Sequence, residues 1–179
     1  FAKMAQISMK KIIIIGSGGA GKSTLARQLG EILNIEVFHL DKLYWQSGWI
    51  EPSADEWGKK VEELLKADSW VMDGNFGGTM EMRLKACDTA IFMDFPPAIC
   101  LYRVLKRRLK YRNTNRPDMS EGCNEKVDLE FLGWIWSYRK IKKPKVEKIL
   151  QKFEKEKNIV RLTSPKEVNN FLDELKSTI

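Results

Sequence analysis

The sequence has few of the residues that cross-link a fold or span a membrane. Its 179 residues include three cysteines and one histidine. Cys87, Cys100 and Cys123 have none of the close-paired spacings of a zinc site or a disulfide framework, so we expect reduced thiols. The longest apolar runs, such as residues 12–15, fall far short of the roughly 20 residues that cross a bilayer. We therefore expect a cytoplasmic protein with no membrane partner.

Internal repeats, low-complexity segments and linkers between domains are also absent from the sequence. A length of 179 residues lies within the usual range for a single domain. We therefore expect one domain over residues 9–179. Residues 1–8, FAKMAQIS, have neither signal nor transit features. We expect them to be an appended or disordered start, with Met9 as the natural first residue.

Basic residues outnumber acidic ones, 31 to 24, which gives a formal net charge of +7. Such a charge favours a polyanionic partner, whether a nucleotide, a nucleic acid or an acidic surface. The sequence has no recognisable helix-turn-helix, zinc finger or OB pattern of a DNA-binding module. Charge alone therefore leaves the partner open.

Short apolar runs alternate with longer amphipathic patterns along the chain. This alternation is typical of an α/β protein with a parallel sheet. The nearly continuous apolar run at residues 12–15 suits a central strand covered on both faces. The expected strands are residues 11–15, 36–40, 69–73, 89–94 and 158–162.

A glycine-rich segment, GSGGAGKST, follows the first expected strand and opens a helix. It matches G-x-x-x-x-G-K-[ST], the phosphate-binding loop, in the strand–loop–helix context that the motif requires. Successive backbone N–H groups and the helix N-terminus there can surround a phosphate chain. The expected nucleotide-binding residues are Gly16, Gly18, Gly19, Ala20, Gly21, Lys22, Ser23 and Thr24.

Three polar side chains are candidates for the chemistry beside this loop. Lys22 is expected to reach the β- and γ-phosphates, and Ser23 to offer its hydroxyl to Mg²⁺. Asp73 ends the third strand, where a carboxylate can hold Mg²⁺ through water; the alternative is a plain Asp-Gly turn. Asp41 follows the second strand, where it can accept or orient the proton of an attacking hydroxyl; the alternative is a helix N-cap.

Arginines gather around residues 112–126, a stretch rich in Asn, Asp, Gly, Pro and Ser that is expected to be a loop. A solvated basic face is the ordinary explanation of such a run. We favour a lid whose guanidinium groups close over the transferred phosphoryl group. The arginines concerned are Arg103, Arg107, Arg108, Arg112, Arg116 and Arg139.

Aromatic residues and the single histidine have less specific patterns. Tyr44, Trp45 and Trp49 follow Asp41 and can stack on a base or sugar, although packing is the commoner role of such a cluster. His39 is interpreted as a core residue. Trp134 and Trp136 project to opposite sides of an expected helix, so at least one should be core.

Several of these segments together resemble a known family over nearly the whole chain from Lys10. GSGGAGKST, HLDKLYW, MDGNF followed by Arg83, TAIFMDFP and the arginine-flanked loop resemble the adenylate-kinase-like branch of the P-loop kinases. More closely, LDKLYW, GNF and EFLGWIWSYRK resemble the bacterial DNA topology modulation proteins, a group related to flagellar regulation.

The resemblance implies a P-loop NTPase fold with a five-stranded parallel sheet in the order 2-3-1-4-5, a lid at about residues 112–126, and use of ATP and Mg²⁺. It implies that Arg83 holds a negative group of the acceptor and that Arg108 and Arg112 are the catalytic lid arginines. Arg139 is expected to bind substrate as well. The chain has DGNFGGTMEMR where nucleotide kinases of this branch carry Asp-Gly-Phe-Pro-Arg, so small hydroxylated acceptors stay open beside nucleotides.

Two functions from different classes follow. The first is an ATP-dependent phosphotransferase that acts on a small anionic acceptor, with Lys22, Asp41, Arg108 and Arg112 as catalytic residues. The second is a nucleotide-regulated DNA-binding protein that affects DNA topology, which the basic charge would suit. We favour the first, because it explains the arginine-flanked loop.

Overall fold

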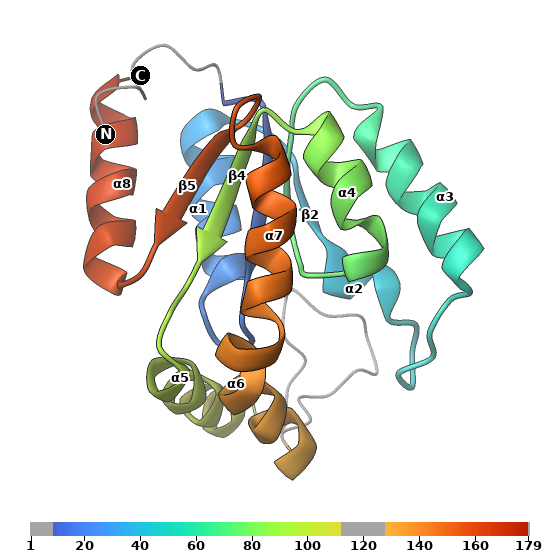
Figure 1. Ribbon diagram of the computed structural model, residues 1–179, viewed down its shortest axis with the longest axis vertical. Helices are drawn as coiled ribbons and strands as arrows, with labels where there is room; N and C mark the ends of the chain where they lie inside the picture. Colours follow the sequence, from blue (N-terminus) through green and yellow to red (C-terminus); the bar gives the residue numbers. More distant parts are fainter. Residues whose placement is uncertain (1–8, 112–127, 179) are drawn as a thin grey trace.

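A single parallel sheet organises the computed structural model of the protein, which describes residues 9–111 and 128–178 (Figure 1). The strands lie in the order β2-β3-β1-β4-β5, and every neighbouring pair is parallel. This confirms the predicted fold class and strand order. The strands are β1 (Lys11–Gly16), β2 (Val37–His39), β3 (Trp70–Asp73), β4 (Thr89–Met93) and β5 (Asn158–Leu162).

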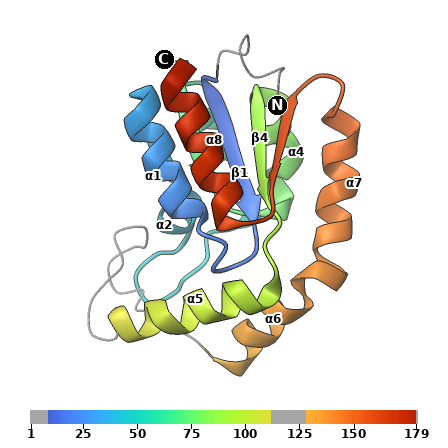
Figure 2. The ribbon, with the colours of Figure 1, turned by 90° about the vertical axis from the view of Figure 1, so that its left-hand side faces the viewer.

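Helices cover both faces of this sheet. Figure 2 shows α1 and α8 on one face and α4 and α7 on the other, while α5 and α6 lie beyond the carboxyl ends of the strands. No helix among the described residues is long and apolar enough to cross a membrane. The helices are α1 (Lys22–Leu33), α2 (Leu40–Tyr44), α3 (Ala54–Leu65), α4 (Gly77–Ala86), α5 (Pro97–Lys110), α6 (Leu129–Ile141), α7 (Lys143–Phe153) and α8 (Pro165–Thr178).

The central strand β1 divides the core into two clusters. All four of its isoleucines, residues 12–15, are 0% exposed. Ile12 and Ile14 join the cluster that includes residues of α1 and α8, whereas Ile13 and Ile15 join the cluster that includes residues of α3, α4 and α7. Alternate side chains of a strand point to opposite faces of the sheet. A strand with helices on both faces therefore needs an apolar residue at every position.

The second strand is shorter than the sequence predicts. It ends at His39, and Leu40, which is fully buried, begins the short helix α2. This early turn places Asp41 on a helix at the carboxyl edge of the sheet. The next helix, α3, begins as its sequence predicts, because Ser53 and Glu56 form a capping box.

Helix α1 approaches β2 closely at Gly30. A Cβ atom at this position would lie 2.3 Å from Cγ2 of Val37 and 3.1 Å from the carbonyl oxygen of Ile35. Gly58 on α3 differs, because a Cβ there would have no neighbour within 4 Å among the described residues. An added methyl group would therefore be crowded at Gly30 and, among the described residues, free of contacts at Gly58.

We predict opposite effects of alanine at these two glycines. Gly30→Ala should lower the free energy of unfolding by about 1–3 kcal/mol, because the added methyl group overpacks the contact with Val37. Gly58→Ala should raise it by up to about 1 kcal/mol, because alanine is the better helix former. Urea unfolding of both variants measures the two changes. In a Val37→Ala background, Gly30→Ala should cost much less than it does in the wild-type protein. If the cost is the same in both backgrounds, the contact with Val37 is not its cause.

Candidate functional site

The loop between β1 and α1, residues 17–21, has the conformation that its glycines predict. Gly19 and Gly21 have φ angles of 77° and 99°, in the left-handed region that favours glycine. A Cβ atom at Gly19 would also lie 2.3 Å from the carbonyl oxygen of Cys100 on α5. Gly19 therefore combines a left-handed backbone conformation with close contact to α5. The loop then leads directly into the N-terminus of α1.

Two side chains brace the phosphate-binding loop from within. The ammonium group of Lys22 donates to the carbonyl oxygens of Gly16 and Ser17, at 3.1 and 3.0 Å. Asn75, from the loop after β3, accepts from the N–H of Gly16 at 3.1 Å and donates to its carbonyl oxygen at 2.8 Å. Asn75 is a site residue that the sequence analysis missed.

Burial lowers the pKa of Lys22 below its ordinary value. The carboxylates of Asp41 and Asp73 oppose this shift, and the guanidinium group of Arg107 adds to it. The four charged groups therefore lie within electrostatic reach of one another. A lysine placed among two carboxylates and an arginine is suited to meet a polyphosphate, whose charge would favour its protonated form.

Ser23, Asp73 and His39 form a hydrogen-bonded group at the start of α1. The hydroxyl of Ser23 donates to Oδ2 of Asp73 at 2.7 Å. Nδ1 of His39 lies 2.6 Å from Oδ1 of the same carboxylate. The structure thus brings Ser23 and Asp73 together as the sequence predicts, and Asp73 is more than a turn residue. His39, interpreted as core from the sequence, instead contacts the site.

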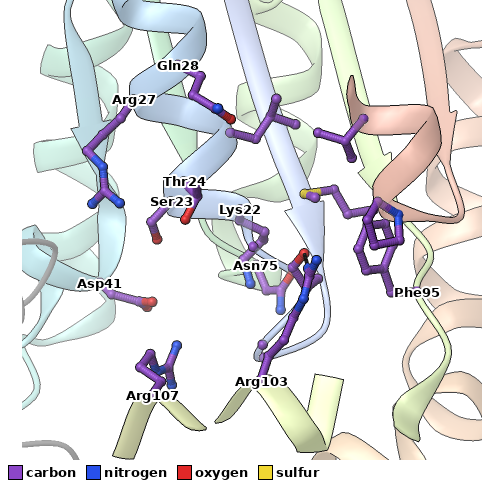
Figure 3. Close-up of a pocket in the computed structure, with 18 of the residues that line it drawn as sticks. Lys22, Ser23, Thr24, Arg27, Gln28, Asp41, Asn75, Phe95, Arg103 and Arg107 are labelled. Atoms are coloured by element: carbon purple, nitrogen blue, oxygen red, sulfur yellow. Dashed lines mark hydrogen bonds between the residues drawn. The ribbon is translucent and has the colours of Figure 1, made fainter. Parts of the chain in front are cut away.

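A pocket of about 720 Å³ extends along the phosphate-binding loop (Figure 3). Its lining includes Pro165, Val168 and Asn169 of α8, which follows the edge strand β5. It also includes Asp41, Trp45 and Phe76, which follow β2, at the opposite edge of the sheet, and its neighbour β3. The loop between them contributes Gly18, Gly19, Ala20, Gly21, Lys22, Ser23 and Thr24 to the lining. The pocket therefore joins a phosphate-binding loop to a carboxylate at the carboxyl edge of the sheet.

Asp41 lies in the first turn of α2 and lines the pocket. The residue in the N-cap position of this helix is His39, so the alternative interpretation of Asp41 as an N-cap does not hold. Figure 3 shows Asp41 on the side of the pocket to which Arg107 of α5 also points. A carboxylate and a guanidinium group thus face the same region next to Ser23.

The arginines of α5 that line the pocket are Arg103 and Arg107, which are four residues apart and share one face of the helix. Arg103 donates to the carbonyl oxygen of Ala20 at 2.9 Å and lies 5.1 Å from the ring centre of Phe95. Arg108 is exposed and is not among the described residues that line the pocket. Arg112 and the predicted lid at residues 112–126 lie outside the described residues, as do residues 1–8.

Arg83 does not have the position that the resemblance implies. It is 0% exposed, and its guanidinium group donates to the carbonyl oxygens of Gly74, Asn75 and Phe76, at 2.9, 2.7 and 3.0 Å. A further N–H group donates to the hydroxyl of Thr79 at 3.2 Å. Burial lowers its pKa to about 10, so it stays protonated at neutral pH. Arg83 therefore holds the loop after β3 from beneath and does not face an acceptor.

Arg139 also differs from its expected position. Its Nε atom lies 3.6 Å from Oδ1 of Asp94, whose other oxygen accepts from Lys143 at 2.7 Å. Among the residues that the structure describes, the pocket lining does not include Arg139. This group ties the region where α6 meets α7 to the end of β4, which makes Arg139 part of the support of the site.

Helix α6 covers the phosphate-binding loop with two aromatic rings. Phe131 and Trp134 stack with their centres 6.0 Å apart, and the Phe131 ring lies against Gly18. Trp134 packs against the core, whereas Trp136 on the opposite side of the helix is 64% exposed. The sequence predicts that at least one of these tryptophans is core, whereas Trp134 is only partly buried and also lines the pocket, so neither is a fully buried core residue.

Solved structures of kinases have a similar fold. A shikimate kinase from Acinetobacter baumannii in complex with shikimate is 14% identical, with a TM-score of 0.52 over 94% of this chain and 91% of that chain. A deoxyadenosine kinase from M. mycoides with bound dATP is 13% identical, with a TM-score of 0.51 over 92% and 98% of the two chains. Comparisons with family models and with curated proteins find no match. At these identities the likeness shows the fold alone.

We predict that Arg83 is essential for stability. Arg83→Lys should lower the free energy of unfolding by about 3 kcal/mol, because one ammonium group cannot satisfy three buried carbonyl oxygens. Chemical denaturation measures the loss. The matched control is Arg161→Lys on β5, where the side chain is nearly half exposed and water can replace lost hydrogen bonds. Equal stability of the two variants would contradict the role assigned to Arg83.

Proposed function

We propose that the protein transfers the γ-phosphoryl group of ATP to an oxygen atom of a small acceptor. The observation that carries this proposal is that the phosphate-binding loop and Asp41 line the same pocket. A loop of this sequence binds nucleotide phosphates. A carboxylate beyond the terminal phosphate can accept the proton of an attacking hydroxyl. The shikimate and deoxyadenosine kinases of similar fold are named for small hydroxylated acceptors, which agrees with this choice.

The two ends of the pocket suggest how ATP lies in it. With its phosphates on residues 16–22, the nucleotide can extend its base toward Pro165, Val168 and Asn169. Arg103 and Phe95 line the same pocket, and their flat groups can contact the base or ribose. The γ-phosphate then faces Asp41 and Arg107, so the acceptor enters from the side of α2.

Ser23 and Asp73 fit a magnesium ion. Their hydroxyl and carboxylate oxygens are 2.7 Å apart next to the loop, and hard oxygen ligands are those that Mg²⁺ prefers. The described residues form no cluster of three or more acidic, histidine or cysteine ligands. That agrees with an ion held by one or two protein oxygens together with phosphate and water. When bound, Mg²⁺ would neutralise part of the charge on the β- and γ-phosphates.

The residues of the chain can carry the transfer as follows. Asp41 takes or orients the proton of the acceptor hydroxyl as its oxygen forms a bond to the γ-phosphorus. The bond from that phosphorus to the bridging oxygen breaks, and ADP leaves. Lys22 and Arg107 contact the charge that spreads over the equatorial oxygens. Arg107 thereby takes the role that the sequence analysis gave to Arg108, which does not line the pocket, while Arg112 lies outside the described residues.

The acceptor stays either a nucleotide or a small hydroxylated metabolite. Because Arg83 donates to the main chain of the loop after β3, an anionic group of the acceptor needs another cationic partner. Arg27, Arg107 and Lys110 line the pocket, and their positive charges favour an anionic acceptor.

We predict that ATP with Mg²⁺ stabilises the protein through Lys22. At a nucleotide concentration about 100 times Kd, binding adds about 2.7 kcal/mol to the free energy of unfolding. This corresponds to a rise in Tm of roughly 5–10 °C for a chain of this size. Lys22→Ala should lose most of the rise, whereas Lys59→Ala, which removes an exposed lysine from α3, should keep it. A folded Lys22→Ala protein with an undiminished rise would contradict the assignment of Lys22.

We predict that Asp41 is needed for turnover with the acceptor. Asp41→Asn should lower kcat by about 100-fold or more, because the amide cannot accept the proton. The matched control is Asp55→Asn on α3, which removes an exposed carboxylate outside the pocket. The assay supplies ATP, Mg²⁺ and panels of nucleoside monophosphates, sugar acids and polyols, and measures acceptor-dependent release of ADP.

Two outcomes of this assay would contradict the proposal. One is an unchanged rate of Asp41→Asn with the acceptor that the wild-type protein uses. The other is release of ADP that DNA stimulates and no small acceptor does, which would favour the nucleotide-regulated DNA-binding alternative.

A further inference from the structure

The acceptor end of the pocket has an aromatic wall. Trp45, at the end of α2, and Phe76, in the loop after β3, both line the pocket together with Asp41. Both aromatic residues are half-buried. The two rings come from segments about thirty residues apart in the sequence, so the fold and not local sequence brings them to one place.

Other aromatic rings hold this wall from behind. The ring of Phe76 lies 4.7 Å from that of Tyr44 and 5.0 Å from that of Trp57, between ring centres. The ring of Trp45 lies 5.0 Å from that of Tyr44 and 5.2 Å from that of Trp49. Trp57 is only 6% exposed and belongs to the core. Phe76 therefore connects the core to the pocket surface.

The backbone of Phe76 is strained. Its φ angle is 22° and its ψ angle is 78°, in a region that non-glycine residues rarely adopt. Such strain persists where the surroundings over-determine it, and it clusters at ligand sites. Here the carbonyl oxygen of Phe76 accepts from Arg83 at 3.0 Å and from the N–H of Thr79 at 3.1 Å.

Arg83 fixes the path of the loop that carries Phe76. A guanidinium group that is fully buried donates to three successive carbonyl oxygens, at residues 74–76. The loop thereby fixes the position of an aromatic ring that packs against the core and also lines the pocket, as Asp41 of α2 does.

We propose that the acceptor carries a planar aromatic ring, as a nucleoside or nucleoside monophosphate does, and that this ring stacks on Phe76 and Trp45. Aromatic side chains bind bases of any sequence through their flat faces. With the ring on this wall, the oxygen to be phosphorylated lies toward Asp41; it is a hydroxyl oxygen in a nucleoside and a phosphate oxygen in a nucleoside monophosphate. The inference rests on the proposed phosphotransferase function and selects the class of its acceptor. Arg83 acts as a positioning residue through Phe76.

The first test compares acceptors with and without an aromatic ring. The probes are deoxyadenosine, thymidine and their 5′-monophosphates on one side, and shikimate, glycerol and gluconate on the other. With ATP and Mg²⁺ present, at least one of the first group should raise ADP release above bare hydrolysis and exceed every ring-free probe in kcat/KM. Transfer confined to the ring-free probes would overturn the inference while leaving the phosphotransferase function intact. Transfer to no probe of either group would contradict both.

The second test removes the rings one at a time. Phe76→Leu and Trp45→Leu should each raise the KM of the ring-bearing acceptor by about tenfold, because leucine fills the space without a flat face. The thermal shift with ATP is measured on each variant to show whether its nucleotide site is intact. The matched control is Trp136→Leu, which removes an exposed tryptophan from α6 outside the pocket lining.

Trp45→Leu keeps this test decisive if the strained loop at Phe76 does not tolerate leucine, because Trp45 has an ordinary extended backbone. Thermal melts identify variants that fold. An unchanged KM in a folded Trp45→Leu protein, or a rise as large in Trp136→Leu, would overturn the stacking.

Discussion

The structure depends on the complete burial of β1 between two parallel neighbours. Because β1 pairs with β3 on one side and β4 on the other, the carboxyl ends of the central strands lie at one edge of the sheet. The phosphate-binding loop begins at this edge, at the end of β1, and Asp73 is the last residue of β3 at the same edge. Helices on both faces bury alternate isoleucines of residues 12–15, so the strand has no freedom to slip by one residue. The position of the loop is therefore set by the core, and the loop can be rich in glycine without losing its place.

Features that depend on one segment were predictable from the sequence. The strands, the phosphate-binding loop and the capping box of Ser53 follow from local patterns, and the structure has them at or near the predicted residues. His39 was not predictable as a site residue. Its role depends on register, because β2 pairs with β3 so that His39 lies beside Asp73. Alternation along one strand shows which residues share a face, but it does not show which residue of the next strand stands opposite.

The errors at the arginines have a related cause. The resemblance located Arg83 by its distance along the chain after Asp73, whereas helix α4 turns its side chain back beneath residues 74–76. On α5, the spacing of charged residues defined a basic face, but only packing against the phosphate-binding loop decided that Arg103 and Arg107 face the pocket. A sequence pattern shows which residues share a face of a helix. It does not show which face contacts the rest of the protein when charged residues occur on several sides.

The way in which Arg83 holds the loop after β3 bears on how such a site can diversify. The guanidinium group binds main-chain carbonyl oxygens, which every amino acid supplies. The hydrogen bonds from Arg83 therefore do not depend on which side chain stands at residue 76. Evolution, or a designer, can vary the acceptor wall at Phe76 without rebuilding the scaffold beneath it. A single buried arginine thus fixes the main-chain path of the loop without depending on the side chain that would contact the acceptor.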